Sequence, residues 1–205
     1  MSNDVLLPEH GVLTFQAEGH EGGPYHSRGF HVPSAASGLT IGRGYDMKSR
    51  TKSQVRDDFL RAGLDPPMAA LISQAAGLKG PEASEFIEEN GLEDFEISKE
   101  VQMELFEVEY ERQASEARRL ATKADVTNKY GATDWDNLNP VIKDVLVDLK
   151  FRGDYTPDCR RFLQQHVVRN DLAGVAEEIG NRDRWPNVPP DRFERRRNYC
   201  MDALG

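Results

Sequence analysis

The chain has 205 residues, enough for one domain with a real hydrophobic core, and its 38% hydrophobic and 30% charged residues are ordinary for a soluble globular protein. A formal charge of −9 argues against a nucleic-acid binder that works by neutralising phosphates. No run of residues is apolar enough to span a bilayer, and Met1–Asp4 lacks the basic-then-apolar start of a secretory signal. We therefore expect either that the protein is synthesised in the cytoplasm without a classical signal peptide, or that the sequence is a piece cut from a longer chain.

The first elements in chain order are a helix and a small sheet. Residues 6–19 have helical apolar spacing, and Gly19 is a natural helix stop. From residue 22 to 46, glycines and prolines break any helix, and apolar residues alternate with polar or small ones. This pattern predicts short strands joined by turns, the only credible sheet in the chain.

Helix-start and helix-stop residues predict helices over the rest of the sequence. The expected starts lie near Thr51, Pro66, Pro81, Ser98, Asn139, Thr156, Asn170 and Pro189. The longest helix is expected at about 99–130, and the helix after Asn139 is the most apolar, hence central. The predicted fold class is α+β, mainly α. We expect one domain over 1–205, with a small sheet lobe at about 20–50 and a helical lobe at about 51–205 that also includes the first helix.

Charge is unevenly distributed along the chain. Residues 82–96 are strongly acidic, and residues 182–197 are rich in arginine. The arginine cluster at 192–197 is interpreted as a solvated helix face with one or two ion pairs. The acidic segment is most simply a soluble surface, and the sharper hypothesis is a docking site for a basic partner such as an immunity or inhibitor protein.

The cysteines and histidines do not form a metal motif. Cys159 and Cys200 have no zinc-site spacing, and the five histidines are not paired at helical ligand spacing. We expect no metal and no cofactor. Two partly buried free thiols are the favoured interpretation of the cysteines, and one disulfide is the alternative if the chain works outside a reducing compartment.

Chemistry-bearing residues concentrate between residues 15 and 47. Glu18 stands at a predicted helix end, one turn after an apolar residue, and is expected to be an acid with a raised pKa. Asp46 follows a strand end in a polar loop and would stay ionised. Period-2 alternation places Thr40 on the same face as Asp46, where its hydroxyl could hold a water against the carboxylate. Such a pair of carboxyl groups is what hydrolysis of a glycosidic bond requires.

Each of these assignments has an alternative. Glu18 could be an ordinary solvated glutamate, and Thr40 only a strand residue. Asp46 could merely cap the following turn. Glu21 is a rival acid, on a glycine-rich turn that would leave its orientation poorly fixed.

Substrate contacts are expected at five further positions. Gly42 would let a sugar approach the backbone, because it has no side chain. Tyr25 and His31 could line a sugar cleft, although packing of the small sheet is their default role. Arg152 and Tyr155, after the central helix, are further candidates.

The motif resembles a known family. Glu18-Gly19 followed by Thr40-Ile41-Gly42-x-Gly44 resembles the phage-lysozyme class of peptidoglycan hydrolases. The string from Ser37 to Asp46 is similar to the pesticin-type lysozyme domain, the toxin branch of that class. The order Glu, Thr, Asp is the pesticin-type order, and this resemblance assigns the Asp role to Asp46. The helix at 139–152 and the Trp185 and arginine-rich tail also resemble parts of such enzymes.

The resemblance implies a two-lobed lysozyme-like fold and a muramidase. Its substrate would be the β-1,4 bond between N-acetylmuramic acid and N-acetylglucosamine in peptidoglycan glycan strands, cleaved with inversion. The alternatives are a non-catalytic peptidoglycan-binding module with the same fold, and chitin or another N-acetylglucosamine polymer as substrate. A lysozyme must reach the cell wall, so we expect action in the periplasm, either of a target cell as an antibacterial effector or at phage-induced lysis.

Overall fold

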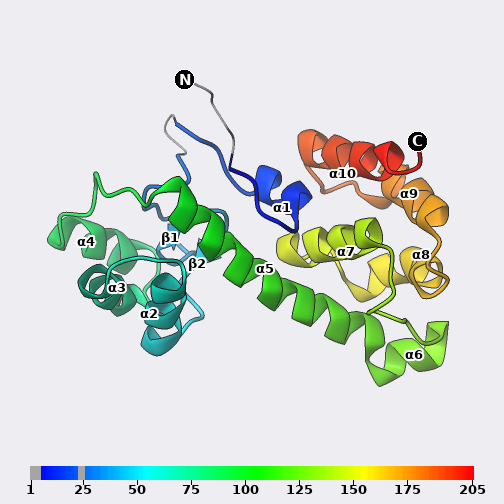
Figure 1. Cartoon of the computed structure of the whole chain (residues 1–205), viewed down its shortest axis with the longest axis horizontal. Helices are drawn as coiled ribbons and strands as arrows, with labels where there is room; N and C mark the ends of the chain where they lie inside the picture. The colour runs from blue at the N-terminus through cyan, green and yellow to red at the C-terminus, as the bar shows by residue number, and fades with distance from the viewer. Residues whose placement is uncertain (1–5, 23–25) are drawn as a thin grey trace. The chain divides into compact units, whose positions relative to one another are not determined.

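The computed structural model describes residues 6–22 and 26–205 (Figure 1). As the sequence predicted, the described chain is mainly helical and has a small two-stranded antiparallel sheet near its N-terminus. The chain divides into two compact units between Glu109 and Tyr110.

The first unit contains the sheet and most of the N-terminal helices. Its elements are α1 (Val12–Ala17), β1 (Thr40–Ile41), β2 (Tyr45–Asp46), α2 (Lys52–Arg61), α3 (Pro66–Ile72), the 3-10 helix η1 (Ser73–Ala75), α4 (Pro81–Glu89) and the first part of α5 (Lys99–Thr122). The unit is larger than the expected sheet lobe at about 20–50, because α2, α3 and α4 belong with the sheet. The organisation of 1–205 as one domain stays a prediction.

Helix α1 is shorter than the predicted helix at 6–19. It begins at Val12 because Gly11 adopts a left-handed conformation (φ 70°) at the N-cap, which few other residues tolerate. It ends with Glu18 as its C-cap. Leu7, which the predicted range 6–19 would place in this helix, is 43% exposed and lies before it.

The sheet is a minimal hairpin. Thr40 pairs with Asp46, and Ile41 pairs with Tyr45. Among the described residues of the region expected to form strands, 22 and 26–46, these four form the ladder, and His31 adds a single antiparallel bridge to Thr40. The turn between β1 and β2 contains two glycines with positive φ, which shortens both strands.

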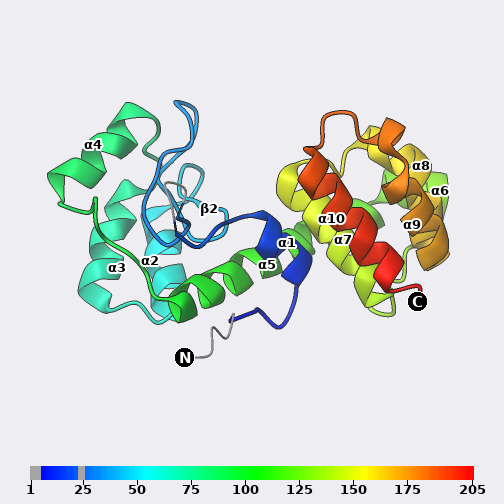
Figure 2. The same ribbon diagram turned by 90° about the horizontal axis from the view of Figure 1, so that it is seen from above.

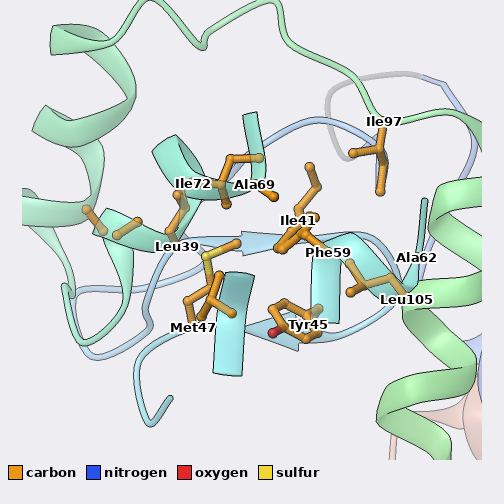
Figure 3. Close-up of a cluster of buried hydrophobic side chains, with 13 residues drawn as sticks. Leu39, Ile41, Tyr45, Met47, Phe59, Ala62, Ala69, Ile72, Ile97 and Leu105 are labelled. Carbon is orange, nitrogen blue, oxygen red and sulfur yellow. The ribbon is translucent and has the colours of Figure 1, made fainter. Parts of the chain in front are cut away.

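One hydrophobic cluster holds the first unit together (Figure 3). Leu39, Ile41 and Tyr45 from the sheet region meet Phe59 of α2 and Ile72 of α3, and each is at most 1% exposed. Burying each such side chain contributes about 1.5–3 kcal/mol, so the cluster fixes the core-facing side of the hairpin.

The second unit is entirely helical among the described residues. After the remainder of α5 it contains α6 (Ala124–Tyr130), α7 (Pro140–Arg152), α8 (Pro157–Val168), α9 (Leu172–Gly180), the 3-10 helix η2 (Arg182–Arg184) and α10 (Pro190–Asp202). Helices α9 and α10 lie side by side in both views (Figures 1 and 2). The long helix expected at about 99–130 is interrupted at Lys123, whose backbone is extended (ψ 152°), so α5 and α6 are separate.

Helix α7 is central to its unit, as its apolar sequence predicted. Five of its apolar side chains are fully buried, and Asp148 is buried among them at 0% exposure. Arg192 and Arg196 of α10 both form ion pairs with Asp148. The interpretation of residues 192–197 as a solvated face is therefore wrong at Arg196, which is 2% exposed and also pairs with Asp154 at 2.8 Å.

Candidate active site

Glu18 lies at the C-terminal end of α1, in the first unit. Its backbone N–H donates to the Thr14 carbonyl (3.0 Å), and its side chain is half-buried. One turn earlier, Phe15 is 3% exposed and packs edge-on against Phe106 of α5, with 5.1 Å between ring centroids. A buried aromatic residue therefore anchors the helix turn that presents Glu18.

The helix ends just before Gly19, as predicted, and packing explains why this residue is a glycine. A Cβ added at this position would lie 2.8 Å from the Ser27 Cβ and 3.0 Å from the Arg43 Cδ. Real Cβ atoms do not tolerate such an approach to Ser27. The absence of a side chain thus lets the chain after Glu18 pass close to the loop that carries Ser27.

His31, Thr40 and Asp46 form a row across the sheet. Thr40 is the bridge partner of His31 and the ladder partner of Asp46. Directly opposed residues in antiparallel pairs point to the same face, so all three share one face. Ile41 and Tyr45, on the opposite face, are core residues. The expectation that Thr40 and Asp46 share a face is confirmed.

Both polar side chains of the ladder bond to the backbone of Gly38. The Asp46 carboxylate accepts N–H bonds from Lys48 (2.7 Å) and Gly38 (3.3 Å), and the Thr40 hydroxyl donates to the Gly38 carbonyl (3.2 Å). A Cβ at Gly38 would lie only 2.5 Å from the carboxylate oxygen Oδ1 of Asp46. The glycine therefore makes room for the carboxylate, which also caps a turn.

Gly42 serves the turn of the hairpin. Its φ is +63°, its N–H donates to the Ser27 carbonyl (2.6 Å), and it is buried. A Cβ there would face Leu105 and Ile97 of the core at ordinary contact distances. Backbone conformation explains this glycine, and its contact with substrate stays a prediction.

Glu21, the rival acid, is held firmly, contrary to the poorly fixed orientation expected from the sequence. Gln102 Nε2 donates to its Oε1 (2.7 Å), and Arg28 Nε donates to its Oε2 (3.0 Å). Partial burial acts to raise its pKa, but the bonds from Gln102 and Arg28 and the charges of Arg28 and Arg43 together lower it. A carboxyl group held ionised in this way is a poor proton donor.

Arg43 is a residue to which the sequence analysis assigned no role. Its Nη1 donates to the carbonyls of Phe15 (2.8 Å) and Gly19 (2.6 Å), and its Nη2 contacts Glu21 at 3.4 Å. Its guanidinium carbon lies 4.1 Å from the Phe15 ring centroid. Its sequence signal was its position between Gly42 and Gly44, in the turn beside the predicted motif.

The remaining predicted contact residues are Tyr25, Arg152 and Tyr155. Tyr25 lies outside the described residues. Arg152 and Tyr155 belong to the second unit: Arg152 donates to Asp154 (2.5 Å) and to the Asn187 carbonyl (2.7 Å). Tyr155 is 4% exposed and donates to Gln164 (2.6 Å), and burial raises its pKa well above the ordinary range. Tyr155 thus packs as a core residue.

The second unit has a pocket of about 240 Å³ between the start of α8 and the loop around Trp185. Phe162 and Trp185, which line it, pack edge-on with 5.4 Å between ring centroids. The Trp185 indole N–H already donates to the Glu178 carbonyl (2.9 Å), and the lining residue Arg184 pairs with Glu178 at 3.0 Å. These two polar groups of the pocket lining are therefore already engaged within the unit.

Cys159 and Cys200 are both buried free thiols, the favoured interpretation from the sequence. Burial raises the pKa of each thiol to about 12, which leaves both unreactive near neutral pH. Within residues 6–22 and 26–205, His, Cys, Asp and Glu side chains form no group of three or more that could hold a metal ion.

None of the helices described is long and apolar enough to cross a membrane. Comparison with curated proteins finds no match to this sequence. Residues 11–197 match the model of DUF8812, a domain of unknown function, and this range includes both the Glu18 segment and the sheet. The chain therefore belongs to the DUF8812 family.

Proposed function

We propose that this protein is a peptidoglycan hydrolase, a muramidase of the lysozyme-like, pesticin-type class. The observation that carries the proposal is the pairing of Thr40 with Asp46 on the sheet face opposite the core, in the same unit as Glu18. The proposed motif order Glu, Thr, Asp uses such a Thr–Asp pair, and the register supports the proposal in this respect.

In the proposed mechanism Glu18 is the general acid and protonates the leaving oxygen of the glycosidic bond. Asp46 is the base that orients and activates a water on the other side of the sugar, and Thr40 helps to hold that water. An inverting reaction requires the two carboxyl groups to be roughly 6.5–9.5 Å apart, leaving room for the water. Glu21 is the less suitable acid, because hydrogen bonds from Gln102 and Arg28 hold it ionised.

A second candidate function is a peptidoglycan-binding module without catalysis. One observation favours it: both carboxylate oxygens of Asp46 already accept backbone N–H groups, from Lys48 and Gly38. An aspartate in this position can have turn capping as its whole role. Each carboxylate oxygen has further lone pairs, so Asp46 can still accept a hydrogen bond from water.

The test compares the parent protein, Glu18→Gln and Glu21→Gln on purified peptidoglycan, with release of soluble fragments as the readout. We expect clearing by the parent, a loss of about 100-fold or more in Glu18→Gln, and nearly full activity in Glu21→Gln. Glu21→Gln is the matched control, because it makes the same chemical change three residues away.

Fragment analysis separates the remaining alternatives. Fragments with reducing N-acetylmuramic acid ends identify a muramidase, and the anomer first formed reports inversion. Cleavage of chitin oligomers in preference to peptidoglycan would identify N-acetylglucosamine polymers as the substrate. A parent protein that sediments with peptidoglycan but releases nothing would be the binding module.

A further inference from the structure

Arg43 connects the turn of the hairpin to the end of α1. Its Nη1 donates to the carbonyl of Phe15, within α1, and to the carbonyl of Gly19, directly after Glu18. These two carbonyls lie on either side of Glu18 in the chain. The segment that carries the proposed acid is therefore bonded to the turn between the two strands that carry Thr40 and Asp46.

Burial makes this connection stiff. Arg43 is 8% exposed, and burial lowers its pKa while the nearby Glu21 carboxylate acts to raise it. The Phe15 ring lies 4.1 Å from the guanidinium carbon. A planar guanidinium group bonded to two carbonyls and lying over a ring has little freedom to move.

Helix α1 needs such support. It has six residues, far fewer than an isolated helix needs to be stable in water. Carbonyl groups at a helix C-terminus lack intrahelical partners and carry partial negative charge, which a buried cation can satisfy. The direction in which Glu18 leaves the helix thus depends on Arg43 as well as on Phe15.

We propose that Arg43 is a positioning residue for the glycosidase reaction, setting the Glu18 carboxyl relative to the Thr40–Asp46 pair. This inference rests on the proposed function. Proton transfer to the leaving oxygen requires near hydrogen-bond geometry, and a displacement of about 1 Å can cost about 100-fold in rate. Arg43 itself takes no part in a chemical step of the reaction. It acts through the backbone on both sides of Glu18.

The experiment measures kcat and KM for fragment release in Arg43→Lys, with Glu21→Gln as control. Lysine keeps the charge, but its compact ammonium group on a flexible stem lacks the planar guanidinium that lies over the Phe15 ring while Nη1 bonds to both carbonyls. We expect kcat of Arg43→Lys to fall about 10- to 100-fold while KM changes by less than about twofold. Glu21→Gln removes the carboxylate near Arg43 but keeps both carbonyl contacts, so its kcat should stay within about threefold of the parent.

Thermal unfolding monitored by circular dichroism identifies which variants are folded. If Arg43→Lys does not fold, Arg43→Gln is measured in its place, because its side chain stays polar and buries no charge. Failure of both variants to fold would overturn the inference, since Arg43 would then be a residue of the fold. A kcat within about threefold of the parent in a folded variant would also overturn it.

The parent protein is assayed first, which keeps the two proposals separate. A parent that releases no fragments contradicts the proposed function, and with it the role of Arg43. An active parent whose Arg43 variants are folded and equally active contradicts the role of Arg43 alone.

Discussion

Thr40 and Asp46 are direct partners across the β1–β2 ladder, and both bond through their side chains to the backbone of Gly38. The hydroxyl donates to the Gly38 carbonyl and the carboxylate accepts from the Gly38 N–H. The position of the proposed base is therefore set by a residue outside both strands. This arrangement makes the site sensitive to changes at a glycine that has no chemistry of its own.

Gly38→Ala should lower both stability and activity. The new Cβ would lie 2.5 Å from Asp46 Oδ1 and from the Lys48 nitrogen, so the strands must shift. We expect the free energy of unfolding to fall by about 1–3 kcal/mol, measured by chemical denaturation, and fragment release to fall with it. Gly29→Ala is the matched control, because no atom lies closer than 3.8 Å to its added Cβ. Equal stability of the two variants would contradict the crowding at Gly38.

Asp46→Asn separates catalysis from turn capping. The amide keeps an oxygen for the Lys48 N–H but weakens the bond from Gly38, so we expect a loss of only about 1 kcal/mol in stability. The substitution removes the proposed general base, so fragment release should fall about 100-fold or more. Asp57→Asn, at an exposed position of α2, controls for the change of charge. Activity close to the parent in Asp46→Asn would leave Asp46 as a cap only.

The ion pairs of Asp148 should be essential to the second unit. Asp148 is fully buried and pairs with Arg192 at 2.6 Å and with Arg196. Asp148→Ala leaves buried guanidinium groups without their carboxylate, and we expect the free energy of unfolding to fall by about 3–5 kcal/mol. Asp158→Ala removes a carboxylate that is 81% exposed and pairs with Arg161, and should cost at most about 1 kcal/mol. A small effect at Asp148 would mean that the arginines reach water.

Glu21 should contribute to stability in a pH-dependent way. Its pKa in the folded protein is lowered, because hydrogen bonds and positive charges outweigh the opposing effect of burial. A lowered pKa means that the stabilisation is fully present above the ordinary glutamate pKa and is lost as pH falls through the folded value. We expect the parent to melt at a higher temperature than Glu21→Gln near about pH 7, with a difference that shrinks below about pH 4. A difference that is constant over this range would contradict the charge network.

The two cysteines should be inert until the protein unfolds. Both are buried, and burial raises the pKa of each thiol to about 12. At about pH 8 the thiolate fraction is then on the order of one in ten thousand, so an aromatic disulfide reagent should react slowly with native protein and quickly in denaturant. Intact mass under non-reducing conditions should correspond to two free thiols. A mass lower by two hydrogens would restore the disulfide alternative.

Local pattern was sufficient for most helix starts in this protein. Thr51 and Gln54 form a capping box at an expected helix start, and Asn139 and Thr156 cap helices whose first residue is proline. Each cap is a contact between residues at most three apart, so sequence spacing alone specifies it. The interruption at Lys123 was missed, because the helical period continues on both sides of the break.

The face shared by Thr40 and Asp46 was also determined by the sequence, since alternation along strands has a fixed period of two. The extent of the sheet was not determined by the sequence. In the part of the chain that the structure describes, only Thr40–Ile41 and Tyr45–Asp46 pair as a ladder, and the earlier segment joins through single bridges. Backbone pairing over a glycine-rich stretch depends on which partner is within reach, and that is decided by the whole unit.

Tertiary structure alone decided the partners of the buried charges. Arg43 bonds to the end of α1, Glu21 is held by Gln102 of α5, and Asp148 is matched by arginines of α10. These partners are far apart in the chain, and no period or cap connects them. A buried charge requires a counter-charge or a hydrogen-bond partner. The sequence shows which residues are charged, but only the tertiary structure determines which residue lies close enough to be the partner.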